Sequence, residues 1–216
     1  MNKMLPVSFI TLLMSTSLQS QDFTNLNFES ARVILITNSA VSSIIATSNA
    51  LPGWSVLAGG GVESPWVHYN DYNGSLFSSM TLLASNQWVI GGNFGVLVAD
   101  GSISQTGLVP GGVESLLFDA TSSSLVVSLG GQNLSYTAIS NALNSYGASY
   151  TIYGVDISGF AGKVETLAFS SGLPDNGAVG VDDIRFSPEA VPEPSAISFF
   201  CLGSGVLFCL RRKYLR

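Results

Sequence analysis

Cysteine is missing from the first 200 residues of this 216-residue sequence, since Cys201 and Cys209 both lie in an apolar run near the C-terminus. This absence excludes a disulfide scaffold, cysteine-ligated zinc and a thiol nucleophile from the body of the protein. Histidine is almost as scarce, because His68 is the sole one. Metal sites built on several histidines are therefore excluded, and no G-x-S-x-G motif is present to support a serine hydrolase.

Positive charge is also scarce. Between Asp22 and Glu193 the sequence holds all 14 acidic residues but only three cations, Arg32, Lys163 and Arg185, so this region carries a net charge of −11. Nucleic-acid binding requires clustered lysine and arginine, so we exclude it as a function. The other five cations lie at the two ends of the chain: Lys3, Arg211, Arg212, Lys213 and Arg216.

The N-terminus has the pattern of a secretory signal peptide, which we place at residues 1–21. Lys3 supplies a minimal positive region, Leu5–Met14 is a short apolar run, and small polar residues follow it. The alternative interpretation is a buried first strand or helix of the fold. The pattern predicts export of the protein.

The C-terminus combines three unlike elements. Pro192, Glu193 and Pro194 form an extended segment that continues neither a strand nor a helix. The uncharged run Ser195–Leu210 follows, and as a helix its 16 residues would span about 24 Å, close to a bilayer core of about 30 Å. The basic residues Arg211, Arg212 and Lys213 then predict that this end stays in the cytoplasm.

This tail, residues 189–216, resembles the PEP-CTERM sorting signal of exported bacterial proteins. The resemblance implies that an exosortase, a membrane enzyme, recognises Pro192, Glu193 and Pro194, while Arg211, Arg212 and Lys213 act as the stop. It also implies that the protein resides in the envelope membrane before processing and at the cell surface or in an exopolysaccharide matrix afterwards. The alternative is a simple C-terminal anchor with a proline hinge.

The body, residues 22–188, reads as one all-β domain. Short alternating or apolar runs are separated by Gly, Ser, Asn and Pro, which predicts about ten strands in an antiparallel β-sandwich. A helix is considered only at 138–146, where a loop is the alternative. The predicted strands are 23–29, 31–37, 53–58, 76–83, 87–90, 94–99, 113–119, 124–129, 149–155, 164–170 and 181–186.

Several body segments carry a second resemblance: NFES at 27–30, LPGW at 51–54, GLVPGGVESLLFDA at 107–120, and VDDIRF at 181–186. Together they are similar to the jelly-roll domain often found ahead of PEP-CTERM tails, which resembles galactose-binding-like carbohydrate-binding modules. The resemblance implies a jelly roll in which residues 31–50 are largely a connection, in conflict with the strand predicted at 31–37.

The same resemblance implies a structural calcium ion. In modules of this type the first and last strands lie close together, and a hard cation commonly ties them through carboxylate and backbone oxygens. Glu29, Asp183 and Asp182 would then supply part of the six to eight oxygen ligands that calcium requires. The alternative is that these acids end strands and face solvent.

A carbohydrate site is predicted at WVHYNDYNG, residues 66–74. Trp66, Tyr69 and Tyr72 offer flat faces for sugar rings, with amide and carboxylate groups beside them. The alternative is that Trp66 and Tyr69 belong to the core and the remainder forms a polar turn.

The sequence therefore predicts an exported, non-enzymatic β-sandwich associated with the cell surface or an extracellular polysaccharide matrix, with carbohydrate as its candidate ligand. Two alternatives stay open, a surface glycan hydrolase that uses paired carboxylates and a purely structural matrix protein. Two carboxylates converging on a groove would favour the hydrolase, whereas an aromatic platform without them would favour a binding protein.

Overall fold

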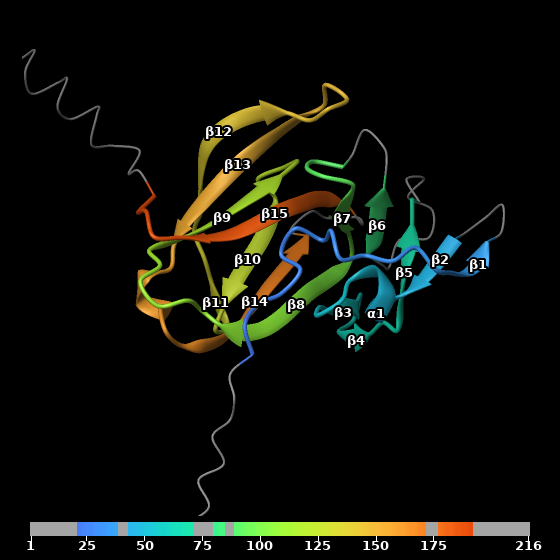
Figure 1. The fold of residues 1–216 in the computed structure, drawn as a ribbon, viewed down its shortest axis with the longest axis horizontal. Coiled ribbons are helices and arrows are strands. Elements are labelled where there is room, and N and C mark those ends of the chain that lie inside the picture. The colour runs from blue at the N-terminus through green and yellow to red at the C-terminus, as the bar shows by residue number, and fades with distance from the viewer. Residues whose placement is uncertain (1–20, 39–42, 71–79, 85–88, 172–176, 192–216) are drawn as a thin grey trace, which may run out of the picture.

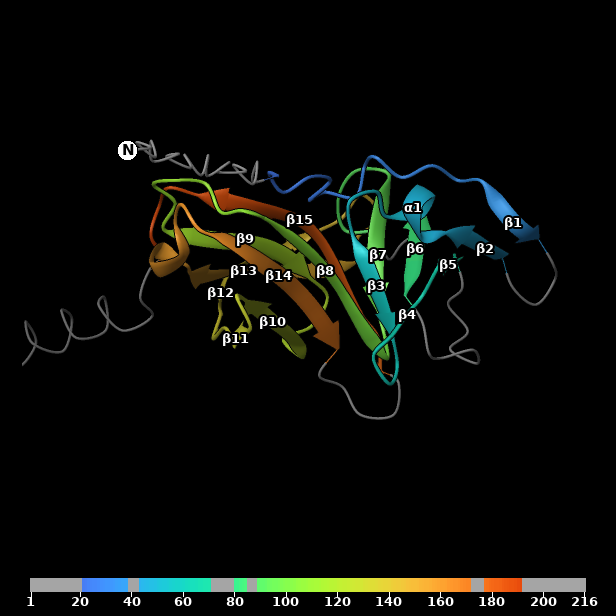
Figure 2. The same cartoon turned by 90° about the horizontal axis from the view of Figure 1, so that it is seen from below.

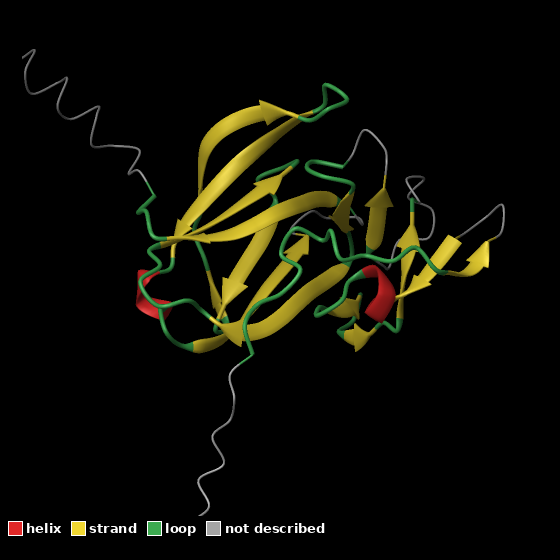
Figure 3. Cartoon of the chain, viewed as in Figure 1, coloured by secondary structure: helices red, strands yellow, loops and turns green. Residues whose placement is uncertain are grey.

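A computed structural model describes residues 21–38, 43–70, 80–84, 89–171 and 177–191. These residues form fifteen β-strands, one short helix, α1 (Thr47–Ala50), and one 3₁₀ turn, η1 (Ser158–Phe160) (Figure 3). The all-β prediction is thereby confirmed. The predicted signal peptide, the Pro-Glu-Pro motif and the predicted C-terminal helix lie outside the described residues. Within the described ranges, no helix has the length and apolar character needed to span a bilayer.

The strands form two sheets, which Figure 1 shows from one side. The larger sheet has nine strands in the order β1-β2-β5-β6-β7-β15-β9-β13-β12. Its strands are β1 (Leu35–Asn38), β2 (Ser43–Ala46), β5 (Trp66–Tyr69), β6 (Thr81–Ala84), β7 (Phe94–Val98), β15 (Val179–Ser187), β9 (Ser115–Ala120), β13 (Ser149–Asp156) and β12 (Thr137–Leu143).

The smaller sheet has six strands in the order β11-β10-β14-β8-β3-β4. Its strands are β11 (Gln132–Asn133), β10 (Leu125–Leu129), β14 (Val164–Ser171), β8 (Gly101–Leu108), β3 (Ser55–Ala58) and β4 (Val62–Glu63). All strand pairs are antiparallel except β5 with β6. Two mostly antiparallel sheets are consistent with the predicted sandwich.

Aromatic residues of the two sheets meet in the core. Phe118 of β9 contacts Phe169 of β14 with ring centroids 5.6 Å apart, and Phe169 in turn contacts Trp54 at 6.3 Å. Trp54 packs on Phe28, and its indole N–H donates a hydrogen bond to the Asn25 carbonyl. All four rings are buried. The NFES and LPGW motifs therefore contribute Phe28 and Trp54 to the layer between the sheets.

The prediction of a strand at 23–29 is wrong, because this segment is irregular and the one isolated bridge nearby, at Asp22, precedes it. Asn25 and Phe28 have positive φ values of 51° and 58°, which no strand accommodates. In this segment the side chain of Gln105 makes the backbone hydrogen bonds that a neighbouring strand would otherwise make. The buried Gln105 accepts a hydrogen bond from the Thr24 N–H at 2.6 Å and donates one to the Thr24 carbonyl at 3.0 Å.

Strand β8 was not predicted, although it pairs along its length with β14. One face of β8 is buried and carries Ile103, Gln105 and Gly107, whereas the other face carries Ser and Thr. Of the three buried residues only Ile103 is strongly apolar, so the sequence pattern does not indicate a strand. The helix considered at 138–146 is also wrong. Residues Thr137–Leu143 form β12, which pairs antiparallel with β13 along most of its length.

Candidate functional site

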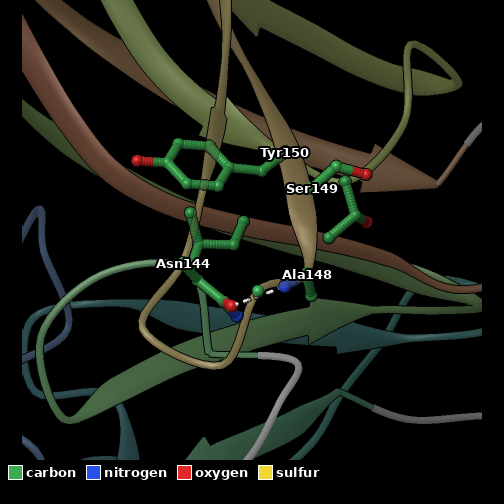
Figure 4. Close-up of a pocket in the computed structure, with 7 residues that line it drawn as sticks. Asn144, Ala148, Ser149 and Tyr150 are labelled. Atoms are coloured by element: carbon green, nitrogen blue, oxygen red, sulfur yellow. Dashed lines mark hydrogen bonds between the residues drawn. The ribbon is translucent and has the colours of Figure 1, made fainter.

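The chain has a candidate ligand pocket on the outer face of the larger sheet, where the β12–β13 hairpin meets β9 (Figure 4). Its volume is roughly 490 Å³. The hairpin provides most of the wall, and strand β9 and the segment before β7 close it from the other side. The lining residues are Ile90, Thr121, Asn144, Gly147, Ala148, Ser149 and Tyr150.

Asn144 fixes the shape of the hairpin tip. Its side-chain oxygen accepts hydrogen bonds from the N–H groups of Tyr146 at 3.0 Å and Ala148 at 2.8 Å. Its side-chain nitrogen donates to the carbonyl of Val89 at 2.8 Å. Figure 4 shows the hydrogen bond from Ala148 to Asn144. One amide therefore closes the turn and attaches it to the segment that carries Ile90. Gly147, with φ at 82°, completes the turn in a conformation that favours glycine.

Tyr150 and Thr121 form the part of the pocket that lies on the sheet. The pairing of Thr151 with Ala120 sets Tyr150 of β13 beside Thr121, just after β9. Ala120 is fully buried in the core, so its neighbour Thr121 lies on the opposite, outer face. The Thr121 hydroxyl accepts a hydrogen bond from the Gly180 N–H at 2.8 Å, which fixes its orientation.

A charged cluster lies beside the pocket. Arg185 of β15 contacts the carboxylates of Asp183 at 2.6 Å and Asp119 at 3.3 Å. Burial raises the pKa of Asp119, and the Arg185 charge offsets part of this rise. Burial also raises the pKa of Tyr150, with the negative charges of Asp119 and Asp183 as further causes. Beside the pocket, two carboxylates therefore face one guanidinium, so acidic groups outnumber basic ones there, although none of the lining residues is charged.

A β-bulge creates this arrangement. Asp182 pairs with Asp119, but the next paired residue on β15 is Arg185, opposite Leu117. The bulge leaves Asp183 with a φ of 44° and an exposed side chain, whereas Asp182 is 1% exposed. Bulges commonly redirect a side chain next to a binding site. Here the bulge separates the two consecutive aspartates.

The predicted calcium ligands are brought together only in part. Glu29 accepts hydrogen bonds from the N–H groups of Asn93 and Phe94, and Asp182 accepts them from Gly91 and Asp183. Both carboxylates thus approach the segment 91–94, and the Glu29 charge contributes to the raised pKa of Asp182.

Asp183, by contrast, is paired with Arg185. The part of the chain that the structure describes contains no group of three or more His, Cys, Asp or Glu residues arranged to hold a metal. Of the three predicted ligands, Glu29 and Asp182 therefore remain as candidates. Most of the lone pairs on their carboxylate oxygens already accept hydrogen bonds from N–H groups. Calcium binding stays a prediction.

The predicted aromatic platform does not lie at the pocket. Trp66 is 38% exposed on β5, and its ring lies edge-on to that of His68 at 5.6 Å. Tyr69 is partly buried and packs against the core, and Tyr72 lies outside the described residues. Strands β6, β7, β15 and β9 separate β5 from β13 in the sheet.

Sequence reasoning missed the pocket residues because 138–146 was considered as a helix or a loop. The signal was present in N-S-Y-G at 144–147, where Asn and Gly mark a turn between runs that alternate in polarity. A hairpin prediction there would have placed Asn144 and Tyr150 near one tip. Comparison with known proteins finds no matching protein-family model, curated protein or solved structure.

Proposed function

We propose that this chain is an exported bacterial protein whose body binds a neutral carbohydrate without cleaving it. In this proposal its PEP-CTERM-like tail, with Pro192, Glu193 and Pro194, is recognised by an exosortase and the export machinery. The protein is then held at the membrane by its C-terminal segment and later resides at the cell surface or in the polysaccharide matrix. The body is a galactose-binding-like jelly roll in this proposal, supported by the buried Phe28 and Trp54 of its motifs.

The lining of the pocket is the observation that carries the carbohydrate proposal. It combines an aromatic ring from Tyr150, hydroxyls from Thr121 and Ser149, and apolar surface from Ile90 and Ala148. Sugar rings require this combination, because their C–H faces pack on flat apolar surface and their hydroxyls need directed polar partners. A purely structural matrix protein would have no need for such a lining.

The surrounding charges favour a neutral sugar over an acidic one. Asp119 and Asp183 lie near Tyr150, and their negative charge would repel the carboxylate of a uronic acid. Neutral hydroxyls pay no such electrostatic cost. The expected ligand is therefore a neutral polysaccharide or one of its short segments.

The arrangement of carboxylates favours binding over hydrolysis. Glycoside hydrolysis uses two carboxyl groups that flank the scissile bond. The described lining of the pocket contains no carboxylate. Asp182 is buried with both oxygens accepting backbone N–H groups, and Asp119 is buried beside Arg185.

A glycan array probed with the full chain tests this proposal, with neutral and uronate-containing glycans compared. Tyr150→Ala removes the aromatic face and should weaken binding about tenfold, equivalent to about 1.4 kcal/mol. Asn144→Ala should weaken it as well, because the hairpin tip loses the hydrogen bonds that shape the pocket.

Trp66→Ala serves as the matched control, because it removes an exposed aromatic ring from a distant strand. Binding that is lost with Trp66→Ala and kept with Tyr150→Ala would assign the site to the segment 66–74 instead. Binding to no glycan on the array would refute the carbohydrate proposal, and release of shortened glycan would favour the hydrolase.

A further inference from the structure

The outer face of the larger sheet continues from the pocket toward Arg185. Strands β13, β9 and β15 are neighbours in this sheet, and Figures 1 and 2 show them side by side. Because side chains alternate along a strand, Asp119 and Leu117 of β9 lie on the same face as the pocket residue Thr121. Arg185 of β15 is paired with Leu117, and its side chain contacts Asp119 at 3.3 Å. Arg185 therefore lies on the same face of the sheet as the pocket.

Tyr150 connects the pocket to the charged cluster. Ile152 pairs with Asp119, so Tyr150, two residues earlier on β13, lies diagonal to Asp119 on the same face. Diagonal neighbours lie about 7 to 8 Å apart, within reach of aromatic and other long side chains. Burial is the main cause that raises the pKa of Tyr150, the charges of Asp119 and Asp183 raise it further, and the charge of Arg185 lowers it. The phenol of this pocket residue is thus close enough to feel all three charges.

Arg185 is held in place by one of its nitrogens. Its Nη1 contacts the carboxylate oxygens of Asp183 at 2.6 Å and of Asp119 at 3.3 Å, and it donates to the Asp183 carbonyl at 2.8 Å. Within the part of the chain that the structure describes, Nε and Nη2 donate no hydrogen bond. These two nitrogens carry most of the N–H donors of a guanidinium, and the side chain is 35% exposed. Arg185 is therefore an oriented group with donors left for a ligand.

The geometry and charge of this group select the kind of oxygen that it binds. Nε and Nη2 form a planar fork, which matches two acceptor oxygens side by side. Two hydroxyls on adjacent carbons of a sugar ring present such a pair. A carboxylate presents one too, but it would meet the negative charges of Asp119 and Asp183, which together outweigh the single guanidinium. Neutral hydroxyl oxygens are therefore the favoured partners.

We propose that Arg185 determines the specificity of the pocket, by donating from Nε and Nη2 to two hydroxyl oxygens on adjacent carbons of a sugar whose ring packs on Tyr150. This inference rests on the proposed carbohydrate function and names the class of sugar, a neutral residue with a free vicinal diol. The hydroxyls of Thr121 and Ser149 both donate and accept, so they discriminate little between sugars. The fork of Arg185 only donates and is fixed by its ion pairs, so it imposes a spacing on the ligand oxygens.

A glycan array probed with the wild-type full chain gives the first test. Cellohexaose and laminarihexaose are the matched probes, because both are neutral chains of β-linked glucose. The internal residues of cellohexaose keep two free hydroxyls on adjacent carbons, whereas those of laminarihexaose do not. Every other pair of neutral glycans on the array that differs in the same way is compared as well. We expect the members with the diol to bind about tenfold more tightly, because only they satisfy both donors of the fork.

Arg185→Lys tests the residue itself. Lysine keeps a positive charge beside Asp119 and Asp183 but lacks the planar fork. We expect the preference for diol-bearing glycans to fall from about tenfold to less than about threefold. A purely structural role of Arg185 would weaken the binding of all glycans equally and leave this ratio unchanged. Arg32→Lys is the matched control, because it makes the same substitution just before β1, at the other end of the larger sheet, and it should keep the preference.

The outcomes separate this inference from the function on which it rests. Equal binding of both members of every pair by the wild type overturns the role of Arg185 and leaves the carbohydrate proposal standing. A preference that survives in Arg185→Lys does the same. A wild type that prefers uronate-containing glycans would show that the fork holds a carboxylate, which overturns both the diol and the neutral sugar. Binding to no glycan refutes the carbohydrate proposal and this inference with it.

Discussion

Two hydrogen bonds join Glu29 to Asn93, which lies 64 residues away in the sequence. The Glu29 carboxylate accepts one from the backbone N–H of Asn93 at 2.7 Å and one from its side-chain amide at 2.9 Å. A third hydrogen bond comes from the Phe94 N–H at 3.0 Å. Gly92 makes the approach possible, because a Cβ there would lie 2.1 Å from the carboxylate. The carboxylate thus holds the irregular N-terminal segment against the start of β7.

Glu29→Gln should destabilise the protein even without a metal ion. The substituted amide keeps one acceptor oxygen but turns an NH₂ group toward N–H donors. We expect the free energy of unfolding to fall by about 1 to 2 kcal/mol, measured by urea denaturation in chelator. Glu63→Gln, on the exposed strand β4, is the control and should change it by less than about 0.5 kcal/mol. Equal effects of the two variants would show that the Glu29 contacts add no stability.

The stability should depend on pH through Asp182. Burial is the main cause that raises its pKa to about 7, with smaller contributions from the charges of Asp183 and Glu29. Between the unfolded value of 3.8 and this value, the native state holds a proton that the unfolded chain has released. Stability from this group is therefore complete below pH 4 and is lost as the pH rises through about 7.

Urea denaturation in chelator across this range measures the effect. The free energy of unfolding should decline with a slope approaching about 1.4 kcal/mol per pH unit from this group. Asp182→Asn should flatten the slope, because the amide does not titrate. An unchanged slope in this variant would mean that other groups cause the pH dependence.

Calcium should raise the melting temperature if the resemblance to metal-stabilised modules holds. The two converging carboxylates, Glu29 and Asp182, are the expected ligands. At a free calcium concentration one hundred times the dissociation constant, the gain is about 2.7 kcal/mol, or roughly 5 to 11 °C for a body of this size.

Two variants test which carboxylates bind calcium. Glu29→Gln should remove the calcium-dependent shift, whereas Asp183→Asn should keep it, because Asp183 is paired with Arg185. Equal melting temperatures of the wild type in millimolar calcium and in chelator would exclude a calcium site of useful affinity.

Replacement of Pro192, Glu193 and Pro194 by alanine should leave the C-terminal tail attached in the native host. The reason is that a sorting enzyme is expected to recognise these three residues. Mass spectrometry of the protein isolated from this host shows whether the C-terminal tail is present. Glu189→Ala, just outside the motif, is the control. A tail that is removed normally from the triple variant would place recognition elsewhere.

The runs with clear alternation were predicted from the sequence close to their observed positions. Examples are β10 and β14, where apolar residues at every second position meet a core on one face. Strand β8 was not predicted, because its buried face includes Gln105 and Gly107. Gln105 hydrogen-bonds to Thr24, and Gly107 packs closely against Phe23, and both partners lie in a distant segment of the sequence. Local patterns do not contain such partners.

The sequence by itself determined the all-β class, the cysteine-free body and the strongly acidic charge, because composition and alternation of polarity are local properties. It also placed Glu29, Asp182 and Asp183 among the residues of interest. Only the tertiary structure decided that a bulge sends Asp182 inward and Asp183 toward Arg185, and that Tyr150 lines a pocket at the β12–β13 hairpin. Strand order and register bring together side chains that are distant in sequence, and neither can be read from one strand at a time.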